Sequence, residues 1–169
     1  MEQPAELPLA RPASWPLLGP AIQVSSAGRA VWAVVGLCGL TVLAVATWLA
    51  PDPRGYGTHE ALFGAWPCGF ILTTGLPCPT CGMTTAFALM MHGRPIDAFI
   101  AQPAGAILCL GTIAACVLSA RIVVTGLAPN VNWDRLGAVR LMLGFGGLLM
   151  TGWGFKLAHG MITGALPGK

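Results

Sequence analysis

Three long apolar stretches, separated by polar turns, dominate the pattern of hydrophobic and polar residues along the chain. They cover about residues 30–50, 98–120 and 136–155, and the first contains no charged residue. A helix of about 20 apolar residues is long enough to cross the hydrocarbon core of a bilayer. Trp32 and Trp48 lie near the two ends of the first stretch, where indole rings favour the membrane interface. The pattern therefore predicts three transmembrane helices.

The region between the first two stretches is also apolar, but it is broken. Residues 61–92 contain Gly75, Pro77 and Pro79, and proline removes a backbone donor from a helix. We expect two short helices joined by a bend, with the second helix over about residues 83–92. Irregular backbone has to be shielded by protein or lie at the interface, because lipid offers no hydrogen bonds. The region is thus a broken hairpin, a re-entrant pair or a fourth span.

The two ends of the chain are predicted to be tails. Residues 1–28 carry a proline at every fourth position from Pro4 to Pro20, and this spacing prevents a continuous helix. We therefore expect a Pro-rich flexible tail there. Lys156 and His159 follow the third apolar stretch and are placed in a C-terminal tail.

Composition favours a surface that faces lipid. The chain is 55% apolar and 9% charged, whereas about 25% of the residues of a soluble domain are charged. The net charge of +3 is scattered without a basic run, so we expect the lipid bilayer, and no nucleic acid, as a partner. Residues 29–169 are predicted to form a single domain. The fold class is an all-α membrane protein with three transmembrane helices and a broken segment carrying Cys-Pro-Thr-Cys-Gly.

Small residues recur on one helical face of the second and third apolar stretches. Such faces let membrane helices approach closely. We expect them to bind a membrane protein partner or a second copy in a homo-oligomer. Packing also explains the cysteines of the second stretch better than chemistry does. The residues are Ala101, Gly105, Cys109, Thr112, Cys116 and Ala120 in the second stretch, and Gly137, Gly144, Gly147, Thr151 and Gly154 in the third.

The other candidate chemistry lies in the broken region. Cys78 and Cys81 form a C-x-x-C just before the expected helix, and Cys68 lies ten residues upstream. Amide groups and the dipole at a helix N-terminus favour a thiolate, so this motif suits metal binding or redox exchange. Cys68 is then a third ligand or a resolving thiol. His92 is a candidate fourth donor, because thiolates and neutral imidazole suit zinc, although one C-x-x-C is half of the usual zinc pattern.

These residues leave three functions open. The first is an accessory, non-enzymatic role, in which Cys68, Cys78, Cys81 and His92 bind a metal such as zinc or the cysteines fix a tight bend. The second is a membrane thiol–disulfide oxidoreductase that uses the same three cysteines, although no second loop pair is visible to pass electrons on. The third is a transporter or assembly subunit, since broken helices can line substrate sites. No intramembrane carboxylate marks a transport path.

The order of cysteines, prolines and glycines resembles the bacterial membrane family known as domain of unknown function 2752. The resemblance covers about residues 68–103, as C-x-F, T-G-L-P-C-P-T-C-G-M-T, H-G and Q-P. Where the family's motif has proline, arginine and aspartate, this chain has Gly69, Thr85 and Arg94. The family has no established activity to carry over. The resemblance implies a multi-pass protein of a bacterial inner membrane and marks the three cysteines as its distinctive residues.

Overall fold

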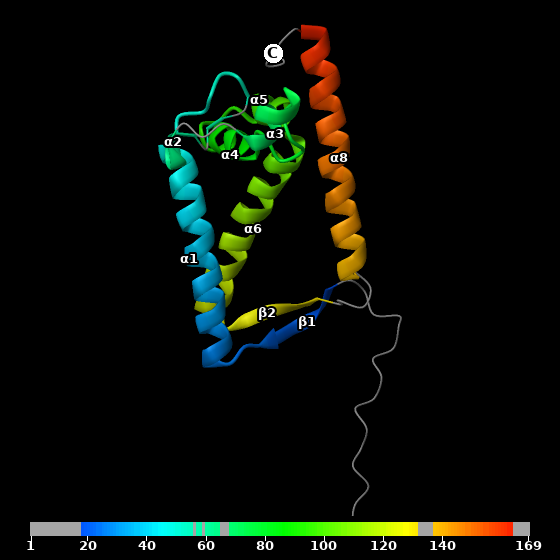
Figure 1. Ribbon diagram of the computed structural model, residues 1–169. Coiled ribbons are helices and arrows are strands. Elements are labelled where there is room, and N and C mark those ends of the chain that lie inside the picture. Colours follow the sequence, from blue (N-terminus) through cyan, green and yellow to red (C-terminus); the bar gives the residue numbers. More distant parts are fainter. Residues whose placement is uncertain (1–17, 56, 59, 65–67, 132–136, 164–169) are drawn as a thin grey trace, which may run out of the picture.

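The computed structural model consists of three long helices, several short ones and a small two-stranded sheet (Figure 1). It describes the chain except for residues 1–17, 56, 59, 65–67, 132–136 and 164–169. Three helices in the described part are long and apolar enough to cross a membrane, which confirms the predicted fold class and indicates a multi-pass membrane protein. They are α1 (Ser26–Trp48), α6 (Pro103–Thr125) and α8 (Ala138–Thr163).

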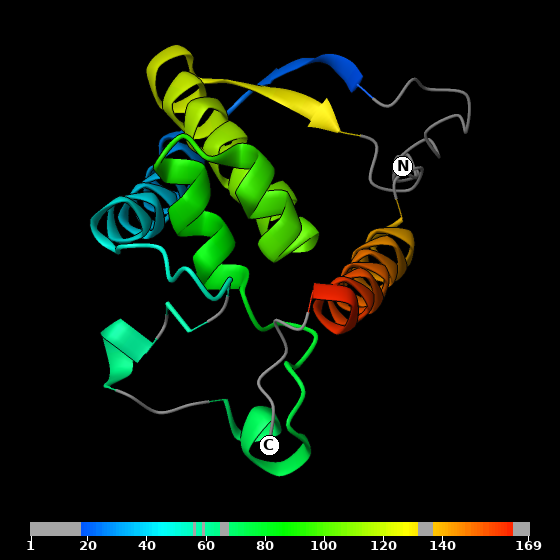
Figure 2. The same ribbon diagram turned by 90° about the horizontal axis from the view of Figure 1, so that it is seen from above.

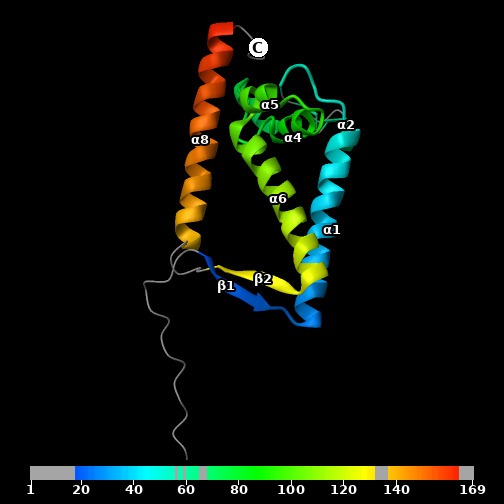
Figure 3. The same cartoon turned by 180° about the vertical axis from the view of Figure 1, so that it is seen from behind.

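The long helices alternate in direction, so α1 ends, α6 begins and α8 ends at the same end of the molecule (Figures 1 and 3). α1 begins four residues earlier than the apolar pattern indicates, because Ser25 caps it and accepts a hydrogen bond from the Gly28 amide at 3.2 Å. α8 continues past its predicted end through Lys156 and His159, which therefore lie on a helix and not in a tail. Lys156 donates hydrogen bonds to the backbone carbonyls of Gly55 and Cys81. These bonds offset the cost of placing a charge on an apolar helix.

Residues 95–101 form a short helix of their own, so the second span begins at Pro103 and not near residue 98 as predicted. This helix and three more from the broken region gather at the end of the molecule where α1 ends (Figure 1). The longest has nine residues, a length of about 14 Å, which is half the thickness of the hydrocarbon core. None of these four helices of the described residues is therefore long enough to be a fourth span. The bend carries the C-x-x-C, as predicted. The helices are α2 (Glu60–Phe63), α3 (Gly69–Thr74), α4 (Met83–Met91) and α5 (Pro95–Ala101).

The small-residue face of α6 packs inside this chain. A methyl group on Gly39 of α1 would lie 2.5 Å from the Cys116 sulfur, and one on Gly105 would lie 2.9 Å from the Ala86 side chain of α4. Cys109 is fully buried between these helices. Close approach of backbones is what small residues permit in membranes, and it accounts for both cysteines of α6.

The glycine face of α8 has a different environment. Seen from above, α8 stands apart from the packed group of α1, α4 and α6 (Figure 2). Gly144, Gly147 and Gly154 have no atom within 4 Å of an added methyl group, whereas Gly152 meets Pro103 at the start of α6. Binding of a partner helix or a second copy to this face stays a prediction.

A short antiparallel sheet lies at the opposite end of the long helices (Figure 1). β1 (Leu18–Gln23) pairs with β2 (Leu127–Val131), with an irregularity between Gly19 and Ile22. β1 falls within the stretch that the proline pattern assigned to a flexible tail. The irregular register explains this difference, because it accommodates Pro20, which has no amide to donate to the ladder.

The core centres on α4. Every residue from Thr85 to Leu89 is buried. Ala86 and Leu89 pack against alanines of α5 and α6, and Phe87 packs against Leu43 and Ala46 of α1. The loop just before α4 is thus anchored to the most buried short helix of the chain.

Candidate metal centre

Cys68, Cys78 and Cys81 come together at the N-terminal end of α4. Their three sulfurs lie within 4.8 Å of one another, and they form the one group of three or more metal-type ligands among the described residues. Cys68 occupies the N-cap position of α3, while Cys78 and Cys81 belong to the loop before α4. Cys81 is buried and the other two are half-buried. Zinc–sulfur bonds of 2.3 Å in a tetrahedron place sulfurs about 3.8 Å apart, so this spacing suits a shared metal ion.

The structure does not bring His92 to this group. His92 follows the C-terminal end of α4, whereas Cys81 precedes its start, and the helix between them is about 14 Å long. The His92 Nδ1 atom lies 2.7 Å from the Ala88 carbonyl oxygen of the same helix. His59 lies outside the described residues.

A tight turn directs both thiols of the C-x-x-C to the same side. The Cys81 amide donates to the Cys78 carbonyl at 3.0 Å, and the Met83 amide donates to the Thr80 carbonyl at 3.2 Å. Gly82 closes the turn with φ +92°, in the left-handed region that L-residues with a side chain avoid. The sulfurs of Cys78 and Cys81 are consequently 3.0 Å apart.

The two thiols of this turn have different proton affinities. Burial opposes ionisation of Cys78, but hydrogen bonds from Cys81, Thr80 and Cys68 outweigh it and lower the pKa of Cys78 to about 7. Burial and the bond to its neighbour raise the pKa of Cys81 well above the usual range. Cys78 is therefore the first of the pair to ionise as the pH rises, and a metal ion has to displace the proton of Cys81.

Alkylation of metal-free protein should follow this difference. The Cys78 rate should rise about tenfold from pH 6 to pH 8 and then level off, because only the thiolate reacts. Peptide mapping by mass spectrometry measures each cysteine separately. In Thr80→Val, which lacks the hydroxyl 3.3 Å from the Cys78 sulfur, the midpoint should move to higher pH. A Cys78 rate that still climbs tenfold per pH unit above pH 8 would contradict the lowered pKa.

The carbonyl oxygens of the thiol loop are held from the other side by α8. The Trp153 Nε1 atom donates to the Pro77 carbonyl at 2.7 Å. One turn further along α8, the Lys156 ammonium donates to the Cys81 carbonyl at 3.0 Å and to the Gly55 carbonyl at 3.2 Å. These two donors join the last membrane-spanning helix to the loop that carries the thiols.

A third donor comes from the junction of α5 and α6. The Gln102 Nε2 atom donates to the Pro79 carbonyl at 2.6 Å, and Gln102 is fully buried. We refer to Gln102, Trp153 and Lys156 together as the carbonyl clamp. Sequence reasoning missed these residues as site residues. The sequence does contain one sign of them. Trp153 and Lys156, whose side chains end in hydrogen-bond donors, are three positions apart in an apolar stretch, which places them on one face of a helix.

Two of the three positions that depart from the family motif, Thr85 and Arg94, have local partners. Thr85, in place of arginine, is fully buried, and its hydroxyl lies 2.8 Å from the Thr58 hydroxyl. Thr58 also accepts a hydrogen bond from the Asp52 amide at 3.0 Å. Arg94, in place of aspartate, forms an ion pair with Asp97 at 2.7 Å. An uncharged hydroxyl pair thus occupies the buried position where the motif has a cation.

Comparison with known proteins supports the resemblance. The family model described as protein of unknown function (DUF2752) matches residues 68–116. This match contains all three clustered cysteines, α4, α5 and the first half of α6. No curated protein and no solved structure matches the chain.

Proposed function

Because residues 68–116 match a family of unknown function, we propose from the chemistry of the site that this protein binds a soft divalent metal such as zinc. Cys68, Cys78 and Cys81 are the ligands. The observation that carries the proposal is the convergence of three sulfurs, from two separate segments, within 4.8 Å. Thiolates select zinc over harder cations.

The surroundings of the thiols favour a bound cation. Three thiolates this close together repel one another, and a divalent ion between them removes that repulsion. Cys81 is buried and would otherwise keep its proton. The chain's own part is to hold the three sulfurs, through the turn and the carbonyl clamp, and the fourth ligand is a water or a donor from a partner.

We further propose an accessory rather than an enzymatic role in a bacterial inner membrane. Three apolar helices support the membrane location, and the family resemblance supports the bacterial one. The thiol loop lies at one end of the long helices (Figure 1), which places the metal near a membrane surface.

Metal analysis of purified protein tests the proposal. Protein isolated without chelators should carry about one zinc ion per chain, and cobalt substitution should give the intense near-ultraviolet band of thiolate ligation. Serine at Cys68, Cys78 and Cys81 together should remove both signals. The matched control is Cys38→Ser, at an exposed cysteine of α1, which should retain them. Wild-type protein without metal and without a cobalt band would contradict the proposal.

A second candidate function is thiol–disulfide exchange, favoured by the 3.0 Å separation of the Cys78 and Cys81 sulfurs and the lowered pKa of Cys78. The Cys78 thiolate would attack a substrate disulfide and form a mixed disulfide. Cys81, after losing its proton, would displace the substrate thiolate, so the substrate gains two electrons and two protons and a Cys78–Cys81 disulfide remains. Alkylation trapping in cells distinguishes the two functions. A pair found partly oxidised favours exchange, and a pair that is always reduced argues against it.

A further inference from the structure

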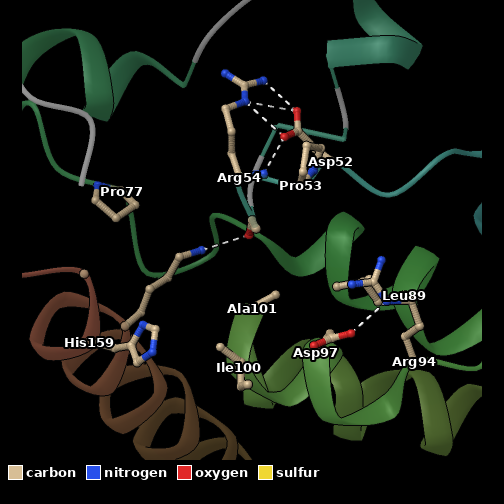
Figure 4. Close-up of a pocket in the computed structure, with 13 residues that line it drawn as sticks. Asp52, Pro53, Arg54, Pro77, Leu89, Arg94, Asp97, Ile100, Ala101 and His159 are labelled. Carbon is tan, nitrogen blue, oxygen red and sulfur yellow. Dashed lines mark hydrogen bonds and ion pairs between the residues drawn. The ribbon is translucent and has the colours of Figure 1, made fainter. Parts of the chain in front are cut away.

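A cavity of about 270 Å³ lies beside the thiol loop (Figure 4). Charged and polar side chains reach it from three separate segments: the loop after α1, the start of α5, and α8. Pro77 of the thiol loop and Ala101 of α5 line it as well. The side chains of the three segments are Asp52 and Arg54, Arg94 and Asp97, and Lys156 and His159.

Both carboxylates of the cavity are already bound to arginines. Asp52 accepts hydrogen bonds from the Arg54 amide at 2.8 Å, from its Nε at 3.0 Å and from its Nη2 at 2.6 Å. Asp97 accepts from the Arg94 Nε atom at 2.7 Å. Arg54 also forms an ion pair with Glu60 at 3.1 Å, so this guanidinium binds two carboxylates. The carboxylates are therefore already paired with the protein's own arginines, and so the cavity does not suit a metal ion.

Arg94 has side-chain N–H donors that a ligand could use. A guanidinium has five N–H groups, and among the described residues Arg94 uses its Nε in the ion pair with Asp97 and no other side-chain nitrogen in a hydrogen bond. Its side chain is 58% exposed. The planar fork formed by its terminal nitrogens fits the oxygens of a phosphate group.

Lys156 and His159 line the cavity from α8, and Figure 4 shows His159 on that side. The Lys156 ammonium reaches across to the Gly55 carbonyl and brings a positive charge to the cavity wall. The His159 ring packs on Phe155, with ring centroids 6.0 Å apart. With Arg94 on the facing wall, the cavity offers hydrogen-bond donors and positive charge from two sides.

From this arrangement we propose that the cavity binds a phosphate group, with Arg94 as its principal ligand contact. The segments that line the cavity are the loop after α1, α5 and the last part of α8. They lie at one end of the long helices (Figure 1), where a membrane surface would be. The phosphate belongs either to a lipid headgroup at that surface or to a soluble phosphate ester. Both sources present the same oxygens to Arg94. None of the three cysteines lines the cavity, although Lys156 belongs both to the cavity and to the carbonyl clamp.

Calorimetry on the full chain in a maltoside detergent tests this proposal. The probes are inorganic phosphate, dihexanoyl phosphatidic acid and dihexanoyl phosphatidylcholine, at an ionic strength held constant with chloride. We expect saturable binding that Arg94→Gln weakens by about tenfold, the value of one charge-assisted hydrogen bond. The matched control, Arg121→Gln, removes an arginine near the opposite end of α6 and should leave the affinity unchanged.

A second variant distinguishes a specific loss of binding from misfolding of the Arg94→Gln protein. Asp97→Asn releases Arg94 from its ion pair and should tighten phosphate binding, by about threefold for a partly exposed pair. Phosphatidic acid binding at least tenfold tighter than inorganic phosphate supports a lipid source, and equal affinities support a soluble ester. Failure of all three probes to saturate, or an Arg94→Gln protein that binds as tightly as wild type, would overturn the proposal.

Discussion

Trp153→Phe should weaken metal binding by about tenfold to a hundredfold, although Trp153 touches no thiol. The substitution keeps an aromatic ring of similar shape in α8 but removes the Nε1–H group that donates to the Pro77 carbonyl. Groups that hold the ligands of a metal typically contribute this much to its affinity. Competition with a chelator, followed through the cobalt absorption band, measures the change.

Substitutions at the other two members of the carbonyl clamp should weaken metal binding in the same way. Lys156→Met and Gln102→Met remove the donors to the Cys81 and Pro79 carbonyls while keeping most of the apolar volume. The matched control is Trp48→Phe, at an exposed tryptophan of α1, which should bind metal as wild type does. If the clamp variants keep full affinity while wild-type protein binds metal, then the turn alone positions the thiols.

The sequence predicts the membrane helices well because their signal is local. An apolar run of sufficient length has few other uses, so the spans and the bend between them follow from composition and proline positions alone. The packing role of Cys109 and Cys116 follows from the spacing of small residues for the same reason. The approach of Cys68 to the C-x-x-C is similarly favoured, because few residues separate them.

The carbonyl clamp could not be predicted, because its contacts join distant parts of the chain. Trp153 and Pro77 are 76 positions apart, and Lys156 and Cys81 are 75 apart. Such contacts depend on how α8 docks, and a side chain that hydrogen-bonds a backbone carbonyl leaves no pattern in the partner's sequence. His92 is the converse case, because it is near the cysteines in sequence but the length of α4 separates it from them.

Gly82→Ala should destabilise the protein more than any other single methyl addition near the site. Two effects combine. The residue has φ +92°, which costs an L-residue with a side chain about 1–2 kcal/mol. The added carbon would also lie 2.7 Å from the Gly55 carbonyl oxygen and 2.7 Å from the Lys156 ammonium. Because backbone cannot move aside as a side chain can, we expect a total loss of about 3 kcal/mol or more, measured as the free energy of unfolding in mixed micelles.

Two other glycines separate these effects. Gly93 has φ +72° with no atom within 4 Å of an added methyl group, so Gly93→Ala should show the conformational cost alone. Gly69 has equally open space and no positive φ, so Gly69→Ala should be nearly neutral. If Gly82→Ala and Gly93→Ala lose the same stability, the close approach of the Gly55 backbone to the thiol loop is incorrect. The unequal losses that we expect would instead show that this loop is fixed by its contacts as well as by its turn, as a site with three converging sulfurs requires.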